Sequence, residues 1–184
     1  IAAEVRYQDM LPIILDELDI LIGGKYLLLE FSFHSVPNNL ERIIYEITRQ
    51  GITPIIAHPE RIKPWQREPK RLEELINMGC PTQLDIGSFM GTMGPSSEKL
   101  AKFLFDKDAV HLVGSDSHNL QSRALYTKPG YDWLSERYGV EYADLLLKGN
   151  PGKILRGEHI EVYPVHLEPD ALSLKDKFIN MFKS

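Results

Sequence analysis

The chain has 184 residues, of which 43% are hydrophobic and 26% are charged, which are ordinary values for one folded globular domain. Its formal net charge of −5 and the lack of a Lys/Arg cluster argue against a nucleic-acid partner. Its apolar runs are too short to cross a bilayer, no secretory signal opens the sequence, and its single cysteine cannot form an internal disulfide. We therefore expect a cytoplasmic protein without membrane insertion.

Short apolar runs alternate with segments of helical period along the whole chain. Ile1–Val5 has the pattern of a strand already under way, and further strands are predicted at 26–33, 53–57, 82–86 and 110–114. Helices are predicted at 40–47, around 72–76, at 95–107, and in three later segments, 131–138, 141–148 and 151–156. This alternation indicates an α/β fold with a parallel sheet, and both an open doubly wound sheet and a barrel satisfy it.

The last part of the chain has a weaker pattern. We divide the sequence into a main domain, residues 1–160, and a tail, residues 161–184. Leu174, Phe178 and Phe182 recur at helical spacing in the tail and predict a short amphipathic helix. Such a helix either docks on its own domain or binds a partner, and the sequence leaves both open.

Possible metal ligands follow two of the predicted strands. Strand 53–57 runs directly into His58, and strand 110–114 runs into Asp116 and His118, while Glu4 lies near the end of the first apolar run. In parallel α/β folds, functional groups gather at the carboxyl ends of strands. Carboxylates and imidazoles suit Mn, Fe or Zn ions, which polarise a phosphoryl group and activate water. Each residue alone is better explained as polar loop surface or, for His58, as a buried histidine; their combination favours a metal site.

Two arginines belong to the same loops as these ligands. Arg61 follows His58 by three residues, and Arg123 follows His118 by five. A guanidinium stays charged in a pocket and can hold a phosphate through two parallel hydrogen bonds. Surface charge or a salt bridge is the alternative interpretation of both residues.

Other reactive groups in the sequence do not fit a known mechanism. The cysteine-based tyrosine phosphatases need an arginine separated from the nucleophilic cysteine by five residues, but Ile86 occupies that position relative to Cys80. Gly91-Thr-Met-Gly94 lacks the Gly-Lys-Ser/Thr ending of a nucleotide-binding P-loop. No role is assigned to the remaining histidines, His34, His111, His159 and His166.

Three motifs in order resemble a known protein family. They are Ala57-His-Pro-Glu-Arg61, then Gly114-Ser-Asp-Ser-His-Asn119 with Arg123, and then Asn150-Pro-Gly-Lys-Ile154, with Ala3-Glu4-Val5 near the start. Together they are similar to the manganese-dependent tyrosine-protein phosphatases of bacterial capsule and exopolysaccharide synthesis, in the polymerase-and-histidinol-phosphatase superfamily. The similarity covers residues from about 2 to 160, and the first two motifs at this separation are its most specific part.

The resemblance implies a fold, a cofactor and a substrate. The fold is a distorted (β/α)7-type barrel that carries up to three divalent ions, Mn²⁺ with Fe, Zn or Mg as substitutes. Glu4, His58, Asp116 and His118 would be metal ligands, and Arg61 and Arg123 would bind the substrate phosphate. The substrate would be phosphotyrosine on a partner protein, a bacterial tyrosine kinase, and water would attack the phosphorus in line. An oligomer is compatible with the sequence.

One departure from the family pattern limits what this chain would do alone. The family begins with a His-x-His strand, and no such motif precedes Glu4 here. We therefore expect weak metal binding and little activity from these 184 residues by themselves. Two alternatives remain open: a small-molecule phosphoesterase of the histidinol-phosphatase kind, and a binding fragment without catalysis.

Overall fold

The described part of the chain is built on a parallel five-stranded sheet. The computed structural model describes residues 3–4, 21–116 and 127–167, with the side chains of 3–4 left out. The strands pair in the order β1-β2-β3-β4-β5, and every pairing is parallel. Their bounds are β1 Ala3–Glu4, β2 Tyr26–Glu30, β3 Thr53–Ala57, β4 Thr82–Asp85 and β5 Leu112–Gly114. The α/β class with a parallel sheet, expected from the sequence, is confirmed.

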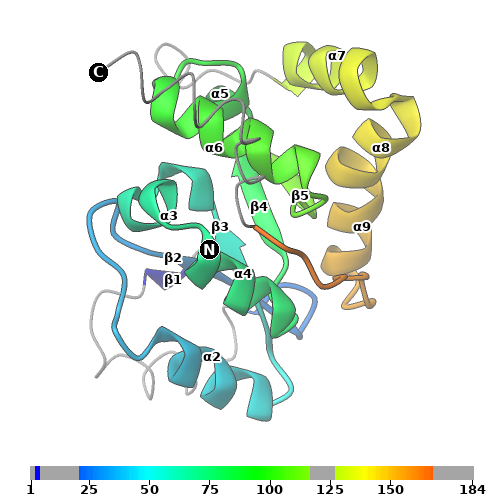
Figure 1. Cartoon of the computed structure of the whole chain (residues 1–184). Helices are drawn as coiled ribbons and strands as arrows, with labels where there is room; N and C mark the ends of the chain where they lie inside the picture. The colour runs from blue at the N-terminus through cyan, green and yellow to red at the C-terminus, as the bar shows by residue number, and fades with distance from the viewer. Residues whose placement is uncertain (1–2, 5–20, 117–126, 168–184) are drawn as a thin grey trace, which may run out of the picture.

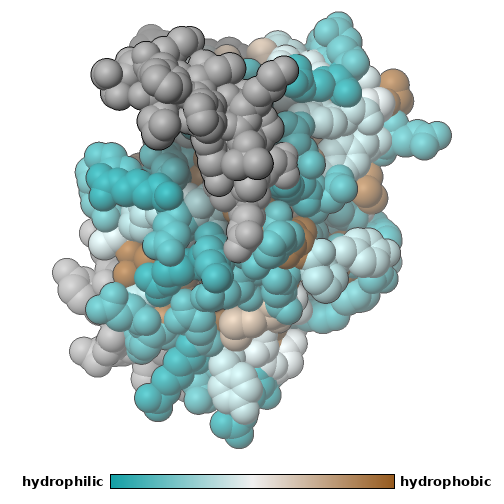
Figure 2. Space-filling model, in the orientation of Figure 1, coloured by the Kyte–Doolittle hydropathy of each residue, from teal (hydrophilic) through white to brown (hydrophobic). Residues whose placement is uncertain are grey.

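Helices connect the strands and follow the last one. They are α2 Leu40–Arg49, η3 Pro59–Arg61, α3 Lys63–Arg67, α4 Lys70–Asn77, α5 Ile86–Phe89, α6 Pro95–Asp106, α7 Thr127–Tyr138, α8 Val140–Asp144, η4 Leu145–Gly149 and α9 Asn150–Leu155. In the part of the chain that the structure describes, no helix is both long and apolar enough to cross a bilayer. Most of the described surface in Figure 2 is hydrophilic, with small and separate hydrophobic patches.

The order of the strands distinguishes between the two architectures that the sequence left open. Each described strand pairs with the next one in the chain, so the sheet grows in a single direction, as the colour series across Figure 1 shows. Right-handed crossovers that all advance in one direction place their helices on one face of the sheet. A doubly wound sheet would instead reverse its strand order. The described strands therefore have the connectivity of a barrel wall, and closure of the barrel stays a prediction.

The two faces of the sheet bury different groups. Leu27 and Leu29 of β2 face the larger hydrophobic cluster, which contains the apolar sides of α2, α4 and α6. Tyr26 of β2 points the other way, because successive strand residues alternate between faces. It joins a smaller cluster with Ile55, Leu112, Ile154 and Ile160. The second face is thus apolar at the amino ends of the strands.

Helical periodicity in the sequence corresponds to real helices with shifted ends. In α2 the buried residues are Leu40, Ile43, Ile44 and Ile47, which is the predicted apolar stripe. The helix predicted around 72–76 spans Lys70–Asn77, and the short helix α3 before it had not been expected. The last two predicted segments form one nearly continuous helical stretch, since α8 passes through the π-helical turn η4 into α9, whereas Gly139 separates α8 from α7. Pro151 explains that turn, because a proline has no N–H with which to continue an α-helical hydrogen-bond ladder.

The first part of the predicted tail lies against the domain. Asn77 of α4 exchanges two hydrogen bonds with the backbone of Val165, and the Leu167 amide donates to Glu73 Oε2 at 2.6 Å. Leu167 is 1% exposed and belongs to the larger cluster. The amphipathic helix predicted from Leu174 to Phe182 lies outside the described residues.

Candidate metal centre

Ionisable side chains follow four neighbouring strands where each strand ends. Glu30 is the last residue of β2, His58 follows β3, Asp85 is the last residue of β4, and Asp116 lies two residues after β5. All these strands are parallel, so their carboxyl ends meet at one edge of the sheet. This edge is opposite to the apolar cluster around Tyr26, and it forms the candidate site.

His58 is held in an uncommon conformation at the end of β3. Its φ of 33° lies in the left-handed region, which residues other than glycine rarely adopt. The side chain is buried, and its Nε2 lies 3.0 Å from Glu30 Oε1. Its Nδ1 is buried and has no hydrogen-bond partner among the described residues. Strained backbone together with an unsatisfied polar atom is typical of a functional position rather than of packing.

Arg61 lies between two carboxylates from different strands. One guanidinium nitrogen, Nη1, is 2.9 Å from Asp116 Oδ2 and 3.6 Å from Asp85 Oδ2. The Arg61 side chain is 11% exposed, and its guanidinium lies over the ring of Phe33 with 4.5 Å to the ring centroid. A cation fixed by two carboxylates and an aromatic face is pre-positioned, so binding an anion requires little further ordering.

Asp85 has one oxygen engaged locally and one facing Arg61. Its Oδ1 accepts a hydrogen bond from the Gly87 amide at 2.8 Å and caps helix α5. Its Oδ2 is buried, and within the part of the chain that the structure describes it has only the longer ionic contact with Arg61. Burial raises the pKa of the Asp85 carboxyl, while the Gly87 hydrogen bond and the Arg61 charge act in the opposite direction. An additional cation near Oδ2 would satisfy this oxygen.

Glu60 is buried beneath the surface of the site and holds its backbone in place through hydrogen bonds. The residue is 0% exposed, and its Oε1 accepts a hydrogen bond from the Asp85 amide at 3.2 Å. The side chain of Gln66 donates to the Glu60 carbonyl at 2.7 Å. Burial raises the pKa of the Glu60 carboxyl to about 7. The Glu60 carboxyl therefore links the segment after β3 to the last residue of β4.

The structure brings together three of the six residues that the sequence singled out. His58, Asp116 and Arg61 lie at the same sheet edge, and the charges of Asp116, His58 and Arg61 all act on Asp85. The backbone of Glu4 pairs in register with Glu30 on the neighbouring strand. His118 and Arg123 lie outside the described residues.

Two ionisable residues of the site, Glu30 and Asp85, were not expected from the sequence. Both end a strand, so the rule that pointed to His58 also applies to them. They were missed because the predicted strands ran on to Phe33 and Ile86, whereas the observed strands stop at the carboxylates.

The donors at this edge fit a divalent cation. One imidazole and the carboxylates of Glu30, Asp85 and Asp116 are the ligand types that Mn²⁺, Fe²⁺, Zn²⁺ and Mg²⁺ accept. The unpartnered His58 Nδ1 and the Asp85 Oδ2 supply orphaned donors in the buried part of the site. Within residues 21–116 and 127–167, however, no three His, Cys, Asp or Glu side chains converge as a closed metal cluster. The described residues therefore do not form a complete metal site by themselves.

Cys80 and His111 lie away from this edge, and the other histidines to which the sequence assigned no role have exposed side chains. Cys80 is completely buried, and burial raises the pKa of its thiol to about 12, which is incompatible with a nucleophilic thiolate. His111 lies at the start of β5, at the opposite end of the sheet, and its Nδ1 accepts a hydrogen bond from the Thr82 amide at 3.1 Å. His34, His159 and His166 have exposed side chains beside Lys63, Glu161 and Glu73, respectively.

The fold and the site define the chain as an α/β protein with a singly wound parallel sheet and a histidine–carboxylate–arginine site at the carboxyl ends of its strands. Residues 2–156 match the family described as capsular polysaccharide synthesis, CpsB/CapC. The chain therefore belongs to the CpsB/CapC family, and the family resemblance expected from its motifs is confirmed.

Individual relatives are similar over most of this chain. The tyrosine-protein phosphatase CpsB of Streptococcus pneumoniae is 37% identical over 149 residues, covering 78% of this chain and 61% of that protein. The tyrosine-protein phosphatase YwqE of Bacillus subtilis is 32% identical over 136 residues, covering 74% of this chain and 53% of that protein. The chain thus spans little more than half the length of these relatives.

A solved structure confirms the similarity of the fold. It comes from work on YwqE of Bacillus subtilis and CpsB of Streptococcus pneumoniae, described as unique metal-dependent tyrosine phosphatases. The TM-score is 0.82 at 28% identity, over 92% of this chain and 69% of that one.

Proposed function

We propose that the protein containing this chain is a metal-dependent tyrosine phosphatase that acts in capsular or exopolysaccharide synthesis. The observation that carries the proposal is the joint presence, at one sheet edge, of metal-binding donors and Arg61. Phosphate-ester hydrolysis needs both kinds of group, because negative charge on the phosphoryl oxygens must be neutralised while water attacks. Membership of the CpsB/CapC family and the activity named for its relatives support the same function.

The residues of this chain have distinct tasks in the proposed reaction. A divalent ion at the site would polarise the phosphoryl group and activate water. Glu30, His58, Asp85 and Asp116 would hold it, with Glu4 and His118 as further predicted ligands. Arg61 binds the phosphate, and Asp85 and Asp116 keep its guanidinium in place before the substrate arrives. Arg123 is proposed as a second phosphate-binding group.

Phe33 provides a surface for the aryl part of the substrate. It lies beside both Arg61 and His58, with 5.6 Å between its ring centroid and that of His58, and it is 38% exposed. An exposed aromatic ring at the rim of a phosphate site favours an aromatic ester through ring–ring contact. This position supports phosphotyrosine over histidinol phosphate as the substrate.

Finer features of the function rest on chemistry and family resemblance. We infer Mn²⁺ as the working ion, because mixed imidazole and carboxylate donors suit it, although Fe, Zn and Mg compete for such sites. The partner is proposed to be a bacterial tyrosine kinase that carries the phosphotyrosine. We place the reaction in the cytoplasm.

The test measures metal content and hydrolysis in the full-length protein. With Mn²⁺ added, it should hydrolyse a phosphotyrosine peptide faster than histidinol phosphate. His58→Ala should lower metal affinity by at least roughly 10- to 100-fold and reduce the rate with it. His111→Asn is the matched control, since His111 is also buried but lies at the other end of the sheet. Equal metal affinity in the two variants, or a preference for histidinol phosphate, would overturn the proposal.

A further inference from the structure

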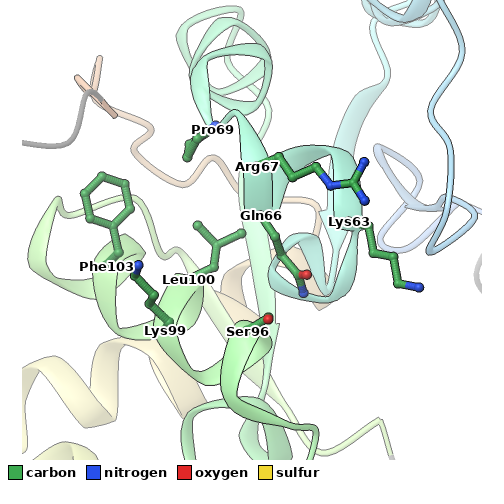
Figure 3. Close-up of a pocket in the computed structure, with 8 residues that line it drawn as sticks. All are labelled: Lys63, Gln66, Arg67, Pro69, Ser96, Lys99, Leu100 and Phe103. Atoms are coloured by element: carbon green, nitrogen blue, oxygen red, sulfur yellow. The ribbon is translucent and has the colours of Figure 1, made fainter. Parts of the chain in front are cut away.

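A groove with basic rims lies between helices α3 and α6. Its volume is about 600 Å³, which is sufficient for several side chains of a ligand. Figure 3 shows Lys63 and Arg67 extending on one side and Lys99 on the other, with Gln66 and Leu100 between them. The remaining lining residues are Pro69, Ser96 and Phe103. The groove therefore combines separated positive charges with a partly apolar floor.

The charges of this groove are available to an external anion. Its lining contains three cations and no carboxylate, although the whole chain has a net charge of −5. The side chains of Lys63, Arg67 and Lys99 are all exposed. Among the described residues none of the three forms an ion pair, and Lys63 Nζ only lies 3.3 Å from His34 Nδ1. Unneutralised cations around a concavity attract an anionic partner and accelerate its association.

The groove is built on the same segment as the candidate active site. Lys63 follows Arg61 by two residues, and its amide donates to the Phe33 carbonyl at 2.9 Å, next to the proposed aryl-binding surface. Gln66 donates to the carbonyl of Glu60, whose carboxyl accepts a hydrogen bond from the Asp85 amide. The groove therefore borders the segment that carries Arg61 and the backbone of Phe33.

We propose that this groove binds acidic residues that flank the phosphotyrosine in the protein substrate. The proposal rests on the proposed function and identifies the recognition of that substrate outside the phosphate site. Arg67 offers a planar guanidinium that can grip a carboxylate through two hydrogen bonds. Lys63 and Arg67 are four residues apart in one helix and so share a face. Lys99 on the opposite rim accommodates a second acidic side chain, and Leu100 and Phe103 contact the aliphatic parts of the peptide.

The experiment compares two phosphotyrosine peptides and one small aryl phosphate in the full-length protein. One peptide carries Glu and Asp on both sides of the phosphotyrosine, and the other carries Gln and Asn at the same positions. In the double variant Arg67→Glu/Lys99→Glu, kcat/KM for the acidic peptide should fall about 5- to 10-fold, since two exposed attractions become repulsions. Hydrolysis of the neutral peptide and of p-nitrophenyl phosphate should stay unchanged. Arg42→Glu, an exposed arginine of α2, is the matched control.

Direct binding separates failure of this proposal from failure of the proposed function. The unphosphorylated acidic peptide, labelled for fluorescence anisotropy, should bind the unmodified protein and the Arg42→Glu variant more tightly than the double variant, and less tightly as salt rises. This readout holds even if no phosphatase activity is found. An equal loss for acidic and neutral peptides, or no loss for either, overturns the groove assignment. Binding of anionic phosphatidylserine vesicles that depends on Arg67 and Lys99, without peptide binding, also overturns it.

Discussion

On the sheet face that carries the smaller hydrophobic cluster, the amino ends and the carboxyl ends of the strands have very different chemistry. At the amino end, Tyr26, Ile55 and Leu112 pack into an apolar cluster. At the carboxyl end, Glu30 lies beside His58, and Arg61 lies between Asp85 and Asp116. The amino end stabilises the sheet, and the carboxyl end carries groups that are costly to bury unless they bind something.

Two buried histidines make this contrast concrete. His111 at the amino end has its Nδ1 satisfied by the Thr82 amide, and its backbone carbonyl accepts a hydrogen bond from Asn150 at 2.9 Å. His58 at the carboxyl end has a left-handed backbone, and its Nδ1 has no partner in residues 21–116 and 127–167. Burial alone therefore does not identify a functional histidine; unsatisfied atoms and backbone strain do.

The largest effect on activity is expected from removing Arg61, the positive side chain at the carboxyl ends of the strands. Arg61→Ala should lower kcat/KM for phosphotyrosine by about 10²–10³-fold, or roughly 3–4 kcal/mol, because a positioned donor to the phosphate is lost. Arg71→Ala is the matched control: Arg71 also holds a carboxylate, Glu41 at 3.2 Å, but on helices α4 and α2. Steady-state kinetics with melting temperatures measure both. Similar activity of the two variants would remove Arg61 from the mechanism.

At the amino end, a truncation should affect stability and leave the chemistry intact. Ile55→Ala, at a position 2% exposed, should lower the free energy of unfolding by about 3 kcal/mol through lost burial and a residual cavity. Urea unfolding provides the measurement, and Tyr45→Ala at the 55% exposed surface should cost less than about 0.5 kcal/mol. Metal content should equal that of the unmodified protein. A loss of metal in Ile55→Ala would break the proposed division between the two ends.

His111, at the amino ends of the strands, should make the stability of the fold sensitive to acid. Burial lowers the pKa of His111 to about 4, whereas an unfolded histidine titrates near 6.5. Below pH 6.5 the unfolded chain therefore binds a proton that the folded chain does not, and stability falls as the pH drops toward 4. The loss is at most about 3 kcal/mol. Urea unfolding between pH 4.5 and 7 should show a flatter dependence for His111→Asn, while Asp108 and Lys153 in the same cavity remain in both proteins. Parallel curves for the two proteins contradict this assignment.

The smallest effect concerns the rim of the carboxyl end. Phe33→Leu should weaken inhibition by phenylphosphonate, a non-hydrolysable aryl analogue, about 3- to 10-fold, since ring contacts contribute roughly 0.5–1.5 kcal/mol. Inhibition by inorganic phosphate should not change, because Arg61 remains. Tyr163→Leu, an exposed aromatic residue in the segment that follows α9, serves as the control. Equal weakening for both inhibitors would mean that Phe33 acts by positioning Arg61 rather than by contacting the aryl group.

The sequence predicted the parts of this molecule in which a pattern changes abruptly. His58 and Arg61 were identifiable because a β-branched strand stops at Ala57 and polar residues follow at once. Glu30 was hidden because Phe31 beyond it is also buried, so the apolar pattern continues past the end of the strand. Asp85 was hidden because it caps α5, a four-residue helix too short to show a period.

Short helices and interrupted helical hydrogen bonding also limited what could be predicted from the sequence elsewhere in the fold. Helix α3 has five residues, with Pro64 in its first turn and Trp65 as its buried side chain, so it offers no repeating stripe. The π-helical turn at Leu145–Gly149 depends on how Pro151 disrupts the ladder around it, which periodicity does not report. The strand order also required the structure, since alternation of strands and helices fits both sheet types.

The strand order has a consequence for how the protein forms during synthesis. From β2 to β5, each strand pairs with the one made roughly 30 residues earlier, so each newly made strand can add to an existing sheet edge as translation proceeds. No strand in this series waits for a distant partner, which keeps loop-closure costs low and similar at every step. Arg61 emerges with β3, before Asp85 and Asp116 have been made. The ion pairs of Arg61 with Asp85 and Asp116 are therefore complete only after β5 has joined the sheet.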